Sequence, residues 1–252
     1  FPPEDSLDLL EKNFTNETAE IEIAIIKLPR ISNFSDIDPL YAEPSVQIKW
    51  IEPGEGIGTP DVLIIPGSKQ TIKDLKSLNK AGLVNQIKNY ANKGGSVFGI
   101  CGGLQMLGIS LEDPFNMDSN SEENSFKCTG MELLPINTIF SKTKHTSRRK
   151  EVTTWPEIES VNGFEMHYGE SQLIKQINSN ISLLFKNNSL GWIEEKQDKG
   201  FIGGTYLHGI FDNIKWRRHW LNKLRDKKGL SLLTINEDES NTFKRDSLLN
   251  SL

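Results

Sequence analysis

The sequence has 252 residues, of which 36% are hydrophobic and 25% charged, and its formal net charge is -5. The length suits one large α/β domain, or one domain with a substantial irregular insertion and tail, and the composition indicates a soluble protein. The negative charge excludes a broad electrostatic attraction to nucleic acid or anionic membranes. No apolar run reaches the roughly 20 residues that span a bilayer, and the N-terminus lacks a signal-peptide pattern. We therefore expect a cytoplasmic protein with no nucleic-acid or membrane partner.

The first half of the chain alternates strand-like and helix-like segments. Strands are predicted over residues 21–27, 46–51, 61–65 and 96–101, and helices over residues 71–92, with a break at Gly82, and 102–109. The strands are short apolar or alternating runs, and the helices repeat apolar residues at mostly helical spacing. Such alternation predicts a parallel sheet with right-handed crossovers. The expected fold is a three-layer α/β/α domain with a flavodoxin-like, doubly wound, mostly parallel sheet.

The second half of the chain has a different pattern. Residues 112–127 are rich in Asp, Asn, Ser and Glu, which predicts an exposed or disordered loop. Additional strands, more antiparallel in style, are predicted over residues 151–154, 181–186, 191–195 and 201–207 and should extend or edge the sheet. Residues 213–228 place apolar side chains among basic ones, which predicts an amphipathic helix packed on the sheet.

The segment Gly99-Ile100-Cys101-Gly102-Gly103 lies where a predicted strand meets a predicted helix. Flanking glycines permit the sharp strand-to-helix turn that exposes a nucleophile. The start of the following helix also favours a thiolate over a thiol. The alternative is an inert buried cysteine, and the spacing of the glycines argues against it.

A second turn, Pro66-Gly67-Ser68-Lys69, ends a different predicted strand of the same sheet. Loops that leave the carboxyl ends of neighbouring strands meet in one crevice. Backbone N–H groups near Gly67 and Ser68, with that of Gly102, would then stabilise an oxyanion formed when Cys101 attacks a carboxamide. A tight turn with a purely structural role is the alternative for this motif taken alone.

Among the four histidines, His208 is the strongest candidate for the catalytic base. It follows the apolar residues 201–207, so it should lie at a strand end within reach of the crevice. His145 and His219 lie among basic residues and are expected on the surface. His167 is a second candidate, for binding or orientation, and a buried structural histidine is the alternative.

Four separated motifs resemble those of the class I glutamine amidotransferases, in the same order. They are Pro66-Gly67-Ser68-Lys69, Gly99-Ile100-Cys101-Gly102-Gly103-Leu104-Gln105, Gly163-Phe164-Glu165-Met166-His167-Tyr168-Gly169 and Tyr206-Leu207-His208-Gly209-Ile210-Phe211-Asp212. Within this family the chain is most similar to the branch of cobyric acid synthases and cobyrinic acid diamide synthases. Residues 28–36 look especially like the cobyric acid synthases. The resemblance extends over about residues 21–230.

The resemblance implies that Cys101 attacks the side-chain amide of L-glutamine and that His208 transfers the protons. The oxyanion or glutamine site would comprise Gly67, Ser68, Gly102 and Gln105. No metal and no cofactor are expected in this chain. Since it has no phosphate-loop motif, ATP and magnesium are expected in a missing N-terminal synthetase domain, which in the family amidates corrinoid carboxylates.

The resemblance also implies a domain organisation. Residues 1–20 are interpreted as a linker from the N-terminal synthetase domain, 21–230 as the amidotransferase domain, and 231–252 as a polar tail. One departure concerns the group that orients His208. Many class I enzymes carry a glutamate two residues after the histidine, whereas this chain has Ile210, as the narrower branch also lacks the glutamate.

The sequence leaves three acidic candidates for the residue that orients His208: Glu165, Glu170 and Asp212. It also leaves other functions open. A stand-alone cysteine hydrolase or peptidase would use the same nucleophile turn, and a non-catalytic flavodoxin-like binding module would not use Cys101 at all. Within the family, the alternatives are a cobyrinic acid a,c-diamide synthase and a peptidoglycan-precursor amidotransferase.

Overall fold

The computed structural model describes residues 18–118, 127–174, 180–186, 188–198 and 200–236. Its centre is a seven-stranded sheet in the order β2-β1-β3-β4-β11-β10-β9. These strands are β2 (Val46–Ile51), β1 (Ile21–Ile26), β3 (Val62–Ile65), β4 (Ser96–Ile100), β11 (Phe201–Thr205), β10 (Asn188–Glu195) and β9 (Ile181–Phe185). The first five run parallel, and β10 is antiparallel to both of its neighbours.

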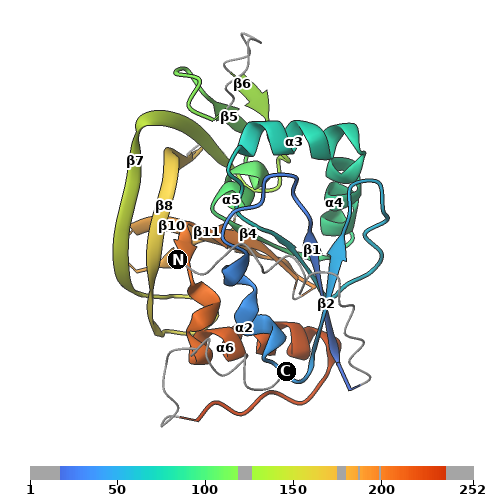
Figure 1. Ribbon diagram of the computed structural model, residues 1–252. Coiled ribbons are helices and arrows are strands. Elements are labelled where there is room, and N and C mark those ends of the chain that lie inside the picture. The colour runs from blue at the N-terminus through green and yellow to red at the C-terminus, as the bar shows by residue number, and fades with distance from the viewer. Residues whose placement is uncertain (1–17, 119–126, 175–179, 187, 199, 237–252) are drawn as a thin grey trace.

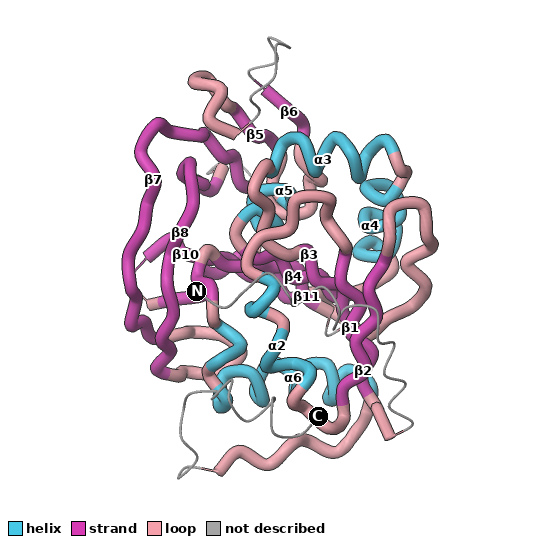
Figure 2. The backbone as a smooth tube through the Cα atoms, in the orientation of Figure 1, coloured by secondary structure: helices cyan, strands magenta, loops and turns pink. Residues whose placement is uncertain are grey.

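Helices cover both faces of this sheet (Figures 1 and 2). On one face lie α3 (Thr71–Lys80), α4 (Leu83–Asn92) and α5 (Gly102–Leu107), and on the other lie the short α2 (Asp38–Tyr41) and α6 (Ile214–Lys228). The break at Gly82 is confirmed, since this residue has a φ of 75° between α3 and α4. The prediction of a three-layer α/β/α domain with a mostly parallel sheet and added antiparallel strands is therefore confirmed.

The amphipathic character of α6 explains how it covers the sheet. Trp216 and Trp220 are both completely buried and pack on Phe98 of β4, with ring centroids 6.1 and 5.9 Å apart. Burying a large aromatic side chain contributes about 2–3 kcal/mol each, so this contact anchors the helix under the centre of the sheet. Not all of its basic residues face solvent, since Arg217 and Arg225 are buried.

A second, five-stranded sheet was not predicted. Its order is β12-β8-β7-β5-β6, from β12 (Leu207–His208), β8 (Ser160–Leu173), β7 (Ile136–Val152), β5 (Ser110–Glu112) and β6 (Lys127–Thr129). The long hairpin of β7 and β8 forms a curved wall beside the central sheet (Figure 1). The expected strand over residues 151–154 is only the end of β7. Between Phe140 and this end, β7 carries only polar and basic side chains, so this part of its sequence lacks the apolar alternation of a half-buried strand.

The prediction of an exposed loop over residues 112–127 is wrong in part. Glu112 ends β5, and the Asp113 and Asp118 side chains beyond it are buried. Asp118 accepts hydrogen bonds from the backbone N–H groups of Thr71 and Ile72, at 2.8 and 2.7 Å, and so caps α3 from a distant part of the chain. Residues 119–126 of the predicted loop, and residues 237–252 of the predicted tail, lie outside the described residues.

Candidate active site

Four neighbouring parallel strands bring the site together. In the sheet, β1, β3, β4 and β11 lie side by side. The segments that follow their carboxyl ends carry Asp36, Ser68, Cys101 and His208, respectively. Loops at this edge of a parallel sheet converge on one crevice, which is where open α/β folds bind their ligands. The sheet order therefore explains why residues so far apart in sequence meet.

Cys101 lies in the sharp turn between β4 and α5 that the sequence predicts. Its φ is 51° and its ψ is -107°, a conformation that costs a non-glycine residue on the order of 1–3 kcal/mol and occurs mainly at functional sites. The neighbouring positions must be glycine because there is no room for a side chain. A Cβ on Gly103 would overlap the Ile65 carbonyl, and a Cβ on Gly99 would overlap the backbone of α5 at Leu104.

His208 is held by the carboxylate of Asp36, which was not among the residues predicted from the sequence. Its Nδ1 lies 2.7 Å from Oδ2 of Asp36, and the other carboxylate oxygen accepts the Gly209 N–H at 2.8 Å. Asp36 ends a 3-10 turn, η2 (Phe34–Asp36), and only 3% of the residue is exposed. Because Nδ1–H donates to Asp36, the Nε2 atom of His208 is left for Cys101.

The electrostatics of His208 favour the imidazolium. Burial lowers its pKa, but the Asp36 charge and hydrogen bond, followed by the hydrogen bond and charge of Cys101, outweigh burial and raise the pKa to about 10. His208 is therefore protonated at neutral pH, although only 1% of it is exposed. A protonated imidazole between a carboxylate and a sulfur is arranged to donate a proton.

Further contacts fix the plane of the His208 ring. Phe164 of β8 stacks on it, with centroids 5.0 Å apart and an interplanar angle of 17°. The Asn33 side-chain nitrogen lies 3.1 and 3.3 Å from the two ring nitrogens. Gly67 leaves room for the ring, since an added Cβ would lie 3.4 Å from His208 Cε1 and 2.6 Å from Ser32 Oγ.

The turn after β3 lies beside Gly102, the residue that follows the nucleophile. Two backbone hydrogen bonds, from Ser32 N–H to Gly67 O at 2.9 Å and from Lys69 N–H to Arg30 O at 2.8 Å, join it to the segment after β1. Because amides alternate in direction along an extended segment, the Ser68 N–H points the other way. A Cβ added to Gly102 would lie 3.0 Å from this Ser68 nitrogen, so the Ser68 amide lies beside Gly102.

Gln105 is engaged within the fold. Its side-chain oxygen accepts a hydrogen bond from the Thr71 hydroxyl at 3.3 Å, and its side-chain nitrogen donates to the Tyr168 carbonyl at 3.0 Å. Only 2% of Gln105 is exposed. It therefore ties α5 to the wall formed by β8. On the same wall, the Met166 carbonyl lies 3.6 Å from the Cys101 sulfur.

The three acidic candidates do not orient His208, and this expectation is wrong. Glu165 forms an ion pair with Arg149 at 2.5 Å, and its other carboxylate oxygen lies 2.8 Å from Nε2 of His167. Glu170 is largely exposed and lies 3.6 Å from His145, while the Asp212 carboxylate lies beside Gly209.

His167 is buried away from the reacting pair. Its Nδ1 lies 2.8 Å from the Gly169 carbonyl oxygen, and its ring stacks on Tyr206, with centroids 3.9 Å apart. Burial is the largest influence on its pKa and, despite the Glu165 contact, the pKa is lowered. His167 therefore stabilises the wall and does not contact Cys101 or His208 in any recorded interaction.

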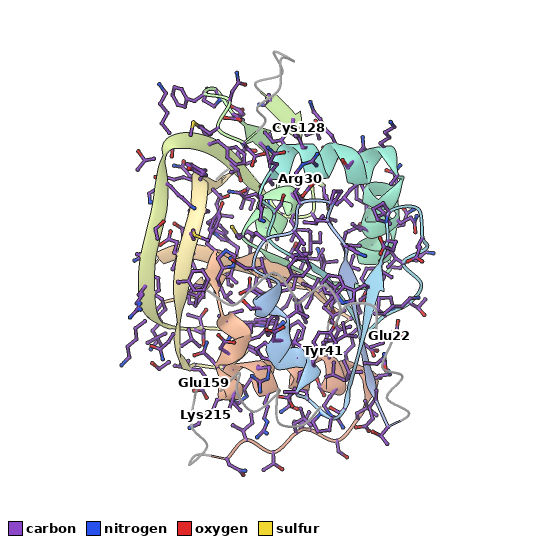
Figure 3. The ribbon with its side chains drawn as sticks, in the orientation of Figure 1. Glu22, Arg30, Tyr41, Cys128, Glu159 and Lys215 are labelled. Carbon is purple, nitrogen blue, oxygen red and sulfur yellow. The ribbon has the colours of Figure 1, made fainter. Side chains whose placement is uncertain are left out.

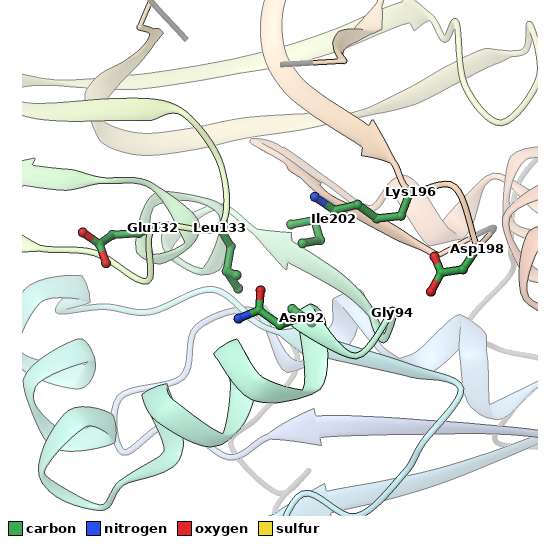
Figure 4. Close-up of a pocket in the computed structure, with 8 residues that line it drawn as sticks. Asn92, Gly94, Glu132, Leu133, Lys196, Asp198 and Ile202 are labelled. Carbon is green, nitrogen blue, oxygen red and sulfur yellow. The ribbon is translucent and has the colours of Figure 1, made fainter. Parts of the chain in front are cut away.

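A cavity of about 280 Å³ lies elsewhere, near the start of β4 (Figure 4). It is lined by Ala91, Asn92, Gly94, Glu132, Leu133, Lys196, Asp198 and Ile202, none of which belongs to the site above. Within the described residues, no cluster of three or more His, Cys, Asp or Glu side chains is arranged to hold a metal ion. Among the same residues, no helix is long and apolar enough to cross a membrane.

Comparison with protein families matches residues 22–216 to the CobB/CobQ-like glutamine amidotransferase domain. A cobyric acid synthase of Prochlorococcus marinus strain NATL1A is 65% identical over all of this chain, which covers 51% of that protein. A cobyric acid synthase of Synechococcus sp. strain WH7803 is 48% identical, with 100% of this chain and 51% of that protein covered. The chain thus spans about half the length of the curated relatives that it matches.

Solved structures show a related fold. A crystal structure of a glutamine amidotransferase matches 82% of this chain and 99% of its own, with a TM-score of 0.55 and 12% identity. The structure of PurLQS from Thermotoga maritima matches 77% of this chain and 89% of its own, with a TM-score of 0.53 and 12% identity. At this identity the similarity concerns the fold alone.

Proposed function

The chain belongs to the CobB/CobQ-like glutamine amidotransferase domain family, and we propose that it is the glutamine-hydrolysing half of a cobyric acid synthase. The observation that carries this proposal is the arrangement of Cys101, His208 and Asp36 at the carboxyl edge of the sheet. The assignment to a cobyric acid synthase is supported by the relatives with that name, which match the chain over its whole length.

The proposed reaction begins at the Cys101 sulfur, which adds to the side-chain carbonyl carbon of glutamine. The amide of Gly102 and that of Ser68, which lies beside Gly102, would donate to the oxyanion. His208 then gives its Nε2 proton to the amide nitrogen, the carbon–nitrogen bond breaks, and ammonia leaves. The product on the enzyme is a glutamyl thioester at Cys101.

The second half of the reaction reverses the role of His208. Now neutral, it accepts a proton from water, which attacks the thioester carbonyl and releases glutamate and the Cys101 thiolate. Asp36 keeps its hydrogen bond to Nδ1 in both halves, so Nε2 is always the atom that exchanges protons with the substrate. The thiolate must remain reduced, which supports the expected cytoplasmic location.

We propose that the ammonia is used by the other half of the full-length enzyme. About half of each matched relative lies outside the region that this chain covers. In the proposal, that half is the N-terminal synthetase domain, which binds ATP and magnesium and activates corrinoid carboxylates. The acceptor is then adenosylcobyrinic acid a,c-diamide, and the product of its four amidations is adenosylcobyric acid.

Replacement of the nucleophile tests the glutaminase assignment. In the full-length enzyme, Cys101→Ala should abolish glutamine-dependent amidation, because no thioester can form. Amidation driven by added ammonium salt should persist, because it bypasses this half. Product formation with each nitrogen source would be measured, with Cys128→Ala as the matched control. Glutamine-dependent amidation by Cys101→Ala would disprove the assignment.

A further inference from the structure

The carboxylate of Asp74 has no role in the reaction described above, although it lies close to the site. It is in the first turn of α3, and its side chain is completely buried. A buried carboxylate is costly unless it is paired and hydrogen-bonded. The partners of Asp74 are therefore informative.

The recorded side-chain partners of Asp74 come from the two segments that form the site. Oδ2 accepts the Ser68 hydroxyl at 2.6 Å and the Arg30 backbone N–H at 3.3 Å, and Oδ1 accepts a guanidinium N–H of Arg30 at 3.0 Å. Arg30 is labelled in Figure 3, where its label stands below α3. One buried charge thus joins the segment after β1 to the turn after β3.

Each of these segments positions one part of the reaction. The turn after β3 carries the Ser68 amide beside Gly102, where the oxyanion is proposed to form. The segment after β1 carries Asn33 and Asp36, which hold His208. The distance between the oxyanion donor and the proton donor therefore depends on how these two segments are fixed to each other.

Capping of α3 does not account for Asp74. Acidic residues in a first turn often stabilise a helix by accepting its free N–H groups. In this protein Asp118 accepts the N–H groups of Thr71 and Ile72. The Asp74 side chain, in contrast, is bonded to Ser68 and Arg30.

We infer that Asp74 is a positioning residue for glutamine hydrolysis, which fixes the Ser68 amide relative to His208 by holding Ser68 and Arg30 together. This inference rests on the proposed glutaminase function. It assigns Asp74 no contact with glutamine. Its loss should therefore impair stabilisation of the oxyanion more than binding of the substrate, and should leave the reactivity of Cys101 intact.

The experiment compares Asp74→Asn with Asp118→Asn in the full-length enzyme. Both variants neutralise a buried carboxylate at the start of α3, but only the first alters the contacts with Ser68 and Arg30. We expect Asp74→Asn to lower kcat for glutamine hydrolysis by roughly 10–100-fold, below the full loss of an oxyanion donor, with KM changed less than about threefold. Asp118→Asn should retain kcat in its folded fraction.

Alkylation of Cys101 by iodoacetamide separates positioning from general damage, because this displacement forms no oxyanion. Its rate in Asp74→Asn should stay within about twofold of wild type. Ser68→Ala, which keeps the backbone amide but removes the hydroxyl, should lower kcat in the same direction, and the double variant should lose less than the product of the two effects. Ser68→Ala also keeps the test available if Asp74→Asn does not fold.

Several results would overturn the inference. They are an unchanged kcat in Asp74→Asn or in Ser68→Ala, equal losses in hydrolysis and alkylation, and fully multiplicative losses in the double variant. If Cys101 of the wild-type enzyme is alkylated but the enzyme hydrolyses no glutamine, the proposed function is disproved, and the role of Asp74 with it. If the wild-type enzyme hydrolyses glutamine and Asp74→Asn hydrolyses it equally well, only the role of Asp74 is disproved and the proposed function stands.

Discussion

At the scale of single residues, the chemistry depends on the contact between Asp36 and His208. A buried imidazole would normally be neutral, because burial lowers its pKa. Here the adjacent carboxylate reverses that tendency and raises the pKa of His208 to about 10. The same hydrogen bond selects the Nδ1–H form of the ring, so that Nε2 faces the sulfur. Asp36 thus fixes both the charge and the orientation of the proton donor.

Neutralising Asp36 should therefore reduce the reaction rate strongly. In Asp36→Asn the ring can adopt the wrong tautomer, and kcat for glutamine hydrolysis should fall by up to about 10⁴-fold, the loss for such an exchange in a serine protease triad. Steady-state kinetics of glutamate release would measure this. Glu43→Gln is the matched control, because Glu43 is also buried and pairs with Arg217. Equal losses in the two variants would contradict the role of Asp36.

The pH profile should change as well. His208 must be protonated to release ammonia, so kcat/KM of the wild type should stay high up to about pH 10 and decline above it. Removing the Asp36 charge removes the main influence that raises this pKa. The alkaline limb of Asp36→Asn should therefore move to lower pH. Initial rates between pH 6 and pH 11 would reveal the shift, and an unmoved limb would argue against the assignment.

At the scale of elements, the turn between β4 and α5 combines strain with close packing. Cys101 adopts a positive φ, and Gly103 lies against the backbone of β3. Such a turn forms only because the packed strand and helix on either side determine its geometry. The position of the sulfur is therefore a property of the whole β4–α5 unit.

Substitution of Gly103 should show how tightly this unit is packed. Gly103→Ala places a methyl group on the Ile65 carbonyl, so we expect a loss of at least about 2 kcal/mol in the free energy of unfolding. Denaturant unfolding followed by circular dichroism would measure it. Gly56→Ala is the control, because no atom lies within 4 Å of its added Cβ. A Gly103→Ala protein as stable as the control would contradict the packing.

The success of sequence-based prediction also differs by element. The central strands are short apolar runs because they are buried on both faces, and such runs can be predicted from the sequence. The strand β7 was not predicted, because basic residues such as Lys142, Lys144 and Arg148 interrupt any apolar pattern. It forms a strand because its backbone pairs with β8. Cys101 and His208 were identifiable because local glycines and strand ends mark them. Asp36 lies in a short 3-10 turn 172 residues from His208, so only the sheet order could reveal it.

At the scale of the whole molecule, the wall formed by β7 and β8 limits access to the nucleophile. Only 6% of Cys101 is exposed, and the Met166 carbonyl of β8 lies 3.6 Å from its sulfur. Glutamine must therefore displace part of this cover before it reaches Cys101. We expect contact with the proposed synthetase half to open this cover.

This arrangement predicts that the chain alone is a weak glutaminase. Glutamate release by residues 1–252 should be at least about tenfold slower than release by the full-length enzyme supplied with ATP and acceptor. Coupled assays at equal enzyme concentration would compare the two, with Cys101→Ala versions to subtract background. Vigorous turnover by the chain alone would show that the wall does not restrict the site.

The sheet order also has a consequence for biosynthesis of the protein. Asp36, Cys101 and His208 meet only after β11 has inserted beside β4, and the residues after His208 must supply α6 to cover that pair of strands. Contacts of such long sequence separation slow folding, because the long intervening segment must first be closed into a loop. Until translation has passed His208, a nascent chain therefore carries Cys101 without its proton donor.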